Sequence, residues 1–89
     1  MKAIITVVGH DKVGIIFKVS EILAKNNINI LDISQTIMQN MFTMIMLVDV
    51  SGASVSFDKI SEILDTLGTE LGLSIKIQHE NIFNSMHRI

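Results

Sequence analysis

The sequence predicts an α+β fold in which two helices cover one face of a four-stranded antiparallel sheet. Three observations support this prediction: two segments that are apolar on both alternating faces, two segments with apolar residues at helical spacing, and the order of the segments along the 89 residues. A chain of this length has room for one domain. We assign that domain to residues 1–79 and expect residues 80–89 to form a tail with a short closing helix.

Residues 2–9 and 42–50 are predicted to be the central strands of the sheet. Both segments carry apolar residues at odd and at even positions, so neither face of either strand is polar. A strand that is apolar on both faces is typical of the middle of a sheet whose two faces are covered. The helices would cover one face, and a second copy of the chain or the tail would cover the other.

The remaining two strands are predicted to be the edges of the sheet. Residues 28–38 alternate in polarity, but their apolar positions slip phase between Ile30 and Leu31. Such a slip is typical of a β-bulge, which is common at sheet edges and beside binding sites. Residues 73–78 alternate regularly, as a half-exposed edge strand does.

Residues 12–25 and 57–71 are predicted to be helices, because their apolar residues recur every three or four positions. Gly68 is expected to weaken the middle of the second helix, and Gly72 to end it. The resulting order, βαββαβ, defines the ferredoxin-like fold, a sandwich of a four-stranded antiparallel sheet and two helices on one of its faces. Its first and third strands are central, in agreement with the polarity of the strands.

The composition argues against several classes of function. The net charge is -2 and no block of basic residues occurs, whereas nucleic-acid binding usually requires a basic surface. The chain has no cysteine, and we find no signal peptide and no apolar segment of membrane length, so we expect a cytoplasmic protein without disulfides. Hydrophobic residues make up 48% of this short chain, which favours association with a second copy.

The sequence contains no recognisable set of catalytic residues. No Ser/His/Asp or Cys/His combination has an informative spacing, and no phosphate-binding loop is present. Acylphosphatases share the predicted fold, but they need an arginine in the loop after the first strand, and the only arginine here is Arg88 in the tail. We therefore expect a protein that is not an enzyme and that uses no cofactor.

Metal binding is also not expected from the sequence. The three histidines, His10, His79 and His87, are scattered along the chain. Four methionines in and around the third strand could hold a soft copper ion, but a methionine-rich strand is more often part of a core or an interface. These four are Met38, Met41, Met44 and Met46.

The turn that joins the first strand to the first helix, residues 9–16, is the candidate binding site. A strand that ends at Gly9, followed by a helix that begins near Asp11, leaves backbone N–H groups unpaired at the positive end of the helix dipole. Such groups suit a carboxylate or another anion. Asp11 could instead cap the helix, and Gly14 would leave room for a ligand or another backbone. An ordinary capped turn has the same spacing, so both interpretations stay open.

Asn29 and Asp32 are polar residues within the otherwise apolar second strand. They either face solvent at the sheet edge, or Asn29 and the nearby backbone contact the amine or carboxylate of a ligand. The pattern alone favours neither interpretation.

Two motifs resemble a known family, the ACT domain. The segment Val7-Val8-Gly9-His10-Asp11-Lys12-Val13-Gly14-Ile15 resembles the signature of this domain, an apolar strand followed by Asp-x-Pro-Gly-Ile or Leu. The segment Asn29-Ile30-Leu31-Asp32-Ile33-Ser34-Gln35 resembles its second-strand motif. The resemblance covers the chain from Lys2 to about His79. It is greatest to an uncharacterised family of small stand-alone ACT proteins of bacteria and archaea that is related to glycine-cleavage regulators.

The resemblance implies a regulatory, allosteric module that binds amino acids or other small ligands. ACT domains commonly pair side by side into an eight-stranded sheet, with the ligand between the first loop of one subunit and the start of the second strand of the other. The residues implied here are Gly9, His10, Asp11, Lys12 and Gly14 of the loop, and Asn29 and Ile30 of the partner copy.

Two positions depart from the pattern of the family. Val13 stands where the family usually has proline, so the loop is less restricted and its backbone has one more donor. Asp11 stands where serine-binding members carry asparagine, and its charge would repel the carboxylate of a ligand but could pair with its amine. The identity of the ligand therefore does not follow from the resemblance.

The leading hypothesis is a homodimer that binds an amino acid or a similar small metabolite and acts on a regulated enzyme or a regulator protein. The alternative is a protein–protein interaction module that binds no metabolite and docks through the sheet face or through Ile82, Phe83 and Met86 of the tail. A small hydrolase or a metal-binding protein ranks last.

Overall fold

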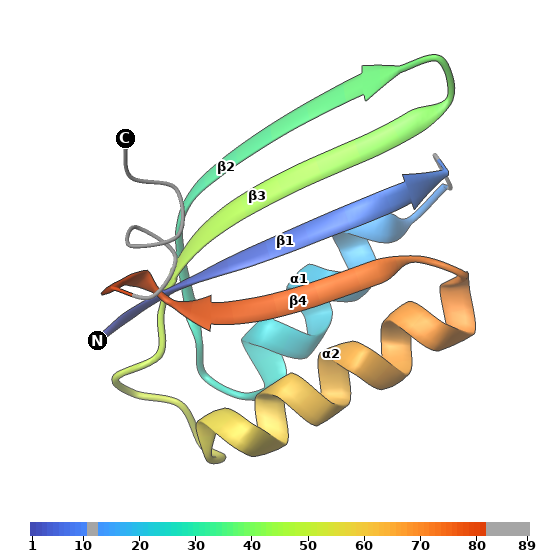
Figure 1. The fold of residues 1–89 in the computed structure, drawn as a ribbon. Helices are drawn as coiled ribbons and strands as arrows, with labels where there is room; N and C mark the ends of the chain where they lie inside the picture. The colour runs from blue at the N-terminus through green and yellow to red at the C-terminus, as the bar shows by residue number, and fades with distance from the viewer. Residues whose placement is uncertain (11–12, 82–89) are drawn as a thin grey trace.

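The computed structural model describes residues 1–10 and 13–81 and shows the ferredoxin-like arrangement (Figure 1). Residues 82–89, which include most of the predicted closing helix, lie outside the described residues. Six elements follow one another in the predicted order: β1 (Lys2–His10), α1 (Ile15–Lys25), β2 (Asn29–Met38), β3 (Met41–Asp49), α2 (Phe57–Leu71) and β4 (Ser74–His79). The predicted fold class is therefore confirmed.

The four strands form one antiparallel sheet in the order β2-β3-β1-β4. β1 and β3 occupy the centre, as their apolar residues on both faces predict, and β2 and β4 are the edges. Both helices pack against the same face of the sheet (Figure 1). We call the opposite face, over which the described residues place no helix, the open face.

The core lies between the sheet and the helices. Every second residue of β1 and β3 points into it, because successive side chains of a strand alternate between faces. Val19, Leu23, Ile60 and Leu64 of the helices are 0–1% exposed and cover these strand residues. The buried residues of β1 and β3 on this face are Ala3, Ile5, Val7, Phe42, Met44, Met46 and Val48. Met44 and Met46 are thus core residues, as the sequence favours.

The predicted irregularity of β2 is a β-bulge. Ile30 pairs with Val48 and Asp32 pairs with Leu47, so Leu31 has no opposite residue on β3. After the bulge, the odd-numbered residues of β2 share the face of the core, since Ile33 pairs with Met46. The even-numbered residues from Asp32 onward lie on the open face.

Gly68 has a packing role that its position in a helix does not suggest. A Cβ atom at Gly68 would lie 2.8 Å from the carbonyl oxygen of Leu73, which is closer than real contacts allow. The chain turns at Gly72, whose φ is 71°, and the backbone N–H of Leu73 donates to the carbonyl oxygen of Gly68 at 2.8 Å. The missing side chain of Gly68 therefore lets the chain pass closely over α2 into β4.

Candidate functional site

The turn between β1 and α1 begins the helix later than the sequence predicts. α1 starts at Ile15, and its N-cap residue is Gly14, which has a left-handed backbone with φ 87° and ψ 5°. The predicted helix start at residue 12 is therefore wrong, and capping by the Asp11 side chain stays a prediction. Asp11 and Lys12, two of the candidate ligand residues, lie outside the described residues.

Gly14 is required by its backbone conformation. A left-handed φ strains any residue with a Cβ atom. Within the part of the chain that the structure describes, and apart from the adjoining residues, no atom lies within 4 Å of the place a Cβ would take. Its carbonyl oxygen accepts the first bond of the helix, from the N–H of Lys18 at 2.9 Å. The predicted open space at Gly14 is present, and the surface beside the first turn of α1 is accessible.

An open cleft of about 290 Å³ lies between this first turn and the hairpin formed by β2 and β3. Its floor is the buried ring of Phe42, and its walls include Ile16 and Ile37, which are 38% and 58% exposed. The cleft is lined by Gly14, Ile15, Ile16, Phe17, Gln35, Ile37 and Phe42. The first N–H groups of an α-helix have no partner within the helix, so the turn can offer donors beside an apolar pocket. This chemistry suits a small molecule with an anionic group and an apolar group.

Gly9 contacts Leu73, the residue that precedes β4, and is not among the residues that line the cleft. A Cβ atom at Gly9 would overlap with Cδ2 of Leu73 and would lie 3.3 Å from its Cα atom. Gly9 therefore brings the end of β1 against the chain that enters β4, and this contact accounts for the glycine without a ligand. His10, the last residue of β1, is exposed and pairs with Met41.

Asn29 and Ile30 lie at the opposite end of the sheet from the turn. Asn29 pairs with Asp49 at the end of β3, whereas His10 pairs with Met41 at its start. Asn29 is exposed and Ile30 is half-buried against the core. Within one chain the structure thus keeps the two candidate motifs apart by the length of a strand.

Of the residues that line the cleft, Gly14 alone was predicted to bind the ligand, and Gln35 and Ile37 are among those that were missed. Both belong to β2 and face the helix side only because the bulge at Leu31 reverses the alternation of the strand. The phase slip in the sequence is the signal that could have identified them. Asp32 makes a local contact instead, since its carboxylate accepts the backbone N–H of Ile33 at 2.9 Å.

Among the described residues, none of those that line the cleft is charged. The pKa of Asp49 is lowered, because the backbone N–H of Ser51 donates to its carboxylate at 2.9 Å and the N-terminal ammonium lies 3.5 Å away. Asp49, however, lies at the Asn29 end of the sheet. Among residues 1–10 and 13–81, no group of three or more His, Asp or Glu side chains is placed to hold a metal ion. Within the same residues, no helix is long and apolar enough to cross a membrane.

Comparison with known proteins agrees with the fold. Residues 2–78, which include the ferredoxin-like sheet and the glycine-containing turn before α1, match the ACT domain. The chain belongs to the ACT domain family. A UPF0237 protein of Clostridium acetobutylicum is 68% identical to it over 89 residues, which cover 100% of both chains.

Two solved structures are similar to the chain. An ACT domain protein from Streptococcus pneumoniae has a TM-score of 0.80 and 43% identity, with 93% of each chain covered. A protein assigned as a glycine cleavage system transcriptional repressor has a TM-score of 0.73 and 25% identity. That similarity covers 86% of this chain and 44% of the repressor. The predicted relation to small ACT proteins and to glycine-cleavage regulators is confirmed.

Proposed function

We propose that this ACT domain is a homodimeric regulatory module that binds an amino acid or a similar small metabolite between its two copies. In this proposal the ligand changes the affinity of the dimer for a regulated enzyme or a regulator protein. The observation that carries the proposal is the edge formed by β2, which pairs with β3 alone among the described strands. This edge is ten residues long, exposes several apolar side chains and lies next to the cleft.

The two edges of the sheet differ in their protection against pairing. β4 has six residues, and its Lys76 lies 3.4 Å from Asp65 of α2. β2 has ten residues; Asp32 is its one charged residue, and it carries neither lysine nor proline, the residues that most often protect an edge strand. Its Leu31, Ile33 and Ile37 are 42%, 40% and 58% exposed. Edge strands that remain unpaired are usually short or carry charges, so β2 is the edge that fits a second copy.

A two-fold axis through the middle of β2 would join the two separated motifs. In an antiparallel pair of β2 strands, the start of one strand lies beside the end of the other. The end of β2 carries Ile37 at the cleft, and the start carries Asn29. Pairing would therefore bring Asn29 and Ile30 of one copy to the cleft and turn of the other, within a sheet of eight strands.

The chemistry of such a composite cleft suits an amino acid. The first N–H groups of α1 would receive the carboxylate, since helix starts favour anions. The amide oxygen of Asn29 could accept a bond from the amine. Phe17 and Ile37 would contact the side chain of the ligand, which favours an amino acid with an apolar side chain.

The experiment that tests the function is thermal unfolding of the protein against a panel of free amino acids at millimolar concentration. A ligand at about a hundred times its dissociation constant adds about 2.7 kcal/mol to stability, which raises the Tm of a small domain by several degrees. We expect a shift with one amino acid or a few related ones. A flat panel would contradict metabolite binding and would favour the alternative of a pure interaction module.

A further inference from the structure

Three side chains with soft or borderline donor atoms form one row across the end of the open face. His10 of β1 pairs with Met41 of β3, and Met41 pairs with Met38 of β2. Directly paired residues of antiparallel strands point to the same face, with Cβ atoms about 4.5–5.5 Å apart. The register therefore aligns an imidazole and two thioethers as immediate neighbours.

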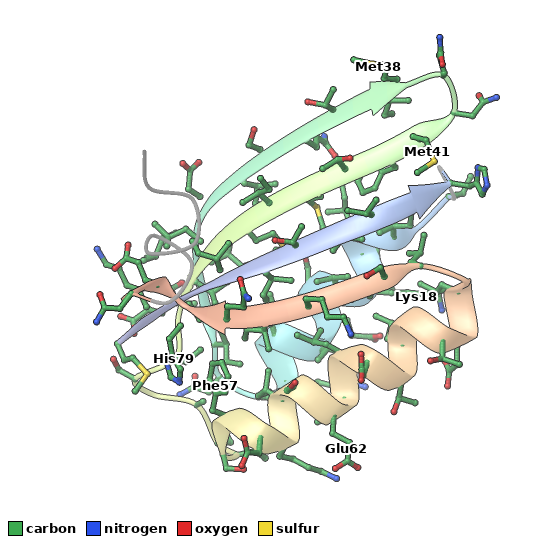
Figure 2. The ribbon with its side chains drawn as sticks, in the orientation of Figure 1. Lys18, Met38, Met41, Phe57, Glu62 and His79 are labelled. Carbon is green, nitrogen blue, oxygen red and sulfur yellow. The ribbon has the colours of Figure 1, made fainter. Side chains whose placement is uncertain are left out.

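The turn of the hairpin fixes the two methionines opposite each other. Gln39 and Asn40 have φ angles of 51° and 69°, the backbone of a two-residue turn that matches the twist of the strands. Met38 and Met41 are the pair that closes this turn. Figure 2 shows them on the two arms of the hairpin, beyond the part of the sheet that the helices cover.

The methionines of β3 and its hairpin fall into two groups that burial separates. Met44 and Met46 are 0% exposed in the core, whereas Met41 and Met38 are 41% and 68% exposed. Packing of the core thus explains the first group and leaves the second unexplained. His10, in the same row, is also exposed.

We propose that His10, Met41 and Met38 bind one soft monovalent metal ion, with Cu(I) as the biological candidate. Thioethers select Cu(I), and imidazole is a common ligand of copper. The adjoining row of the open face holds Thr36 and Thr43, and among the described residues it supplies no carboxylate. An uncharged ligand set disfavours Mg²⁺ and Ca²⁺, which require oxygen ligands.

The row combines fixed positions with adaptable ligand atoms. The paired strands hold the three backbones in place, and methionine has three rotatable bonds through which its sulfur can move. The sulfur of Met38 and the imidazole of His10 can therefore approach a metal ion above Met41, the middle residue. Since only one of the three ligands is a histidine, the histidines taken alone in the sequence do not indicate this site.

This site can be tested separately from the proposed function, although Met38 belongs to β2, the strand that pairs in the proposed dimer. The row lies on the open face, and the cleft lies on the helix side of the hairpin, so the two sites share no ligand-facing surface. The absence of amino-acid binding would leave the metal proposal unaffected. Loss of metal binding would likewise leave the dimer and the cleft unaffected.

Anaerobic titration of the full chain with Cu(I), in competition with a chromophoric chelator of known affinity, tests the proposal. We expect one Cu(I) per chain, and affinity at least tenfold lower in Met38→Leu and in Met41→Leu. The Met46→Leu variant is the matched control, because it removes a thioether from the core and should bind as the wild type does. X-ray absorption of the complex should give two sulfur ligands and one nitrogen ligand.

Two results would overturn the proposal. One is that the wild-type protein binds no Cu(I) in competition with the chelator. The other is a Met38→Leu/Met41→Leu double variant that binds Cu(I) as tightly as the wild type, which would assign the ion to other side chains. The double variant changes only exposed residues, so circular dichroism should show the native fold.

Discussion

Glycine serves two different purposes at three positions of this small domain. Gly14 provides a left-handed backbone, whereas Gly9 and Gly68 provide space for Leu73, the residue that leads into β4. A substitution by alanine should therefore act through backbone strain at Gly14 and through overlap at the other two positions. For Gly68 the expected change in stability is opposite in sign to the one that helix propensity alone predicts.

Gly68→Ala should destabilise the protein. In a helix that lacks such a contact, this change would add about 0.5–1 kcal/mol of stability. Here the new Cβ would press on the carbonyl oxygen of Leu73, and overpacking typically costs about 1–3 kcal/mol. Chemical denaturation should show a net loss of stability of about 1 kcal/mol.

The Glu70→Ala variant is the control, because Glu70 is an exposed residue of the same helix; its stability should change by less than about 0.5 kcal/mol. A Gly68→Ala protein more stable than the wild type would disprove the packing role.

At the scale of elements, the edge formed by β2, which pairs with β3 alone among the described strands, is where we propose that a second copy associates. Its ten residues present unpaired backbone groups between exposed apolar side chains, and the cleft opens beside its second half. The edge formed by β4 is shorter and carries Lys76. Any symmetric extension of the sheet should therefore use β2.

Ile33→Lys should convert the dimer to a monomer. The substitution places a charge within the apolar edge, which is a common way in which natural edge strands avoid pairing. Ser74→Lys, which adds the same charge to the edge strand β4, should leave the dimer intact. Sedimentation equilibrium of the three proteins measures this difference. A dimer that persists in Ile33→Lys and dissociates in Ser74→Lys would move the interface to β4.

The elements could be predicted from the sequence because the periodicity of apolar residues is strong throughout the chain. All four strands, both helices and the bulge after Ile30 follow from that periodicity. The start of α1 could not be predicted, since apolar spacing continues upstream of Gly14 and does not report its positive φ. The contact of Gly9 with Leu73 joins residues that are distant in sequence, so no local pattern reveals it.

The candidate site was only partly accessible to the same reasoning. The Gly14 turn was identified, but Gln35 and Ile37 became members of the cleft only once the bulge had set which residues of β2 face the helices. The row of His10, Met41 and Met38 depends on the pairing of three strands. Neither the cleft residues nor this row has a regular spacing along the chain that would be detected in the sequence.

At the scale of the whole molecule, the proposed binding of a ligand requires two copies of the chain. A single chain keeps Asn29 and the turn at opposite ends of the sheet, so neither motif alone forms a closed site. In the proposed dimer, a two-fold axis would bring each turn together with the other copy's Asn29 and would create two equivalent sites. Regulation would then follow from a ligand that stabilises one arrangement of the two copies.

Complementation between two inactive variants tests this central claim most directly. Gly14→Val damages the turn, and Asn29→Ala removes the amide that the other copy supplies, so each homodimer should bind no ligand. In a mixture that has been unfolded and refolded together, each heterodimer regains one intact site, and random pairing makes about one site in four active. Isothermal titration with the amino acid that gives the largest thermal shift should therefore detect binding in the refolded mixture and none in either variant alone. A mixture that binds nothing, although sedimentation shows that it is dimeric, would contradict a site shared between the two copies.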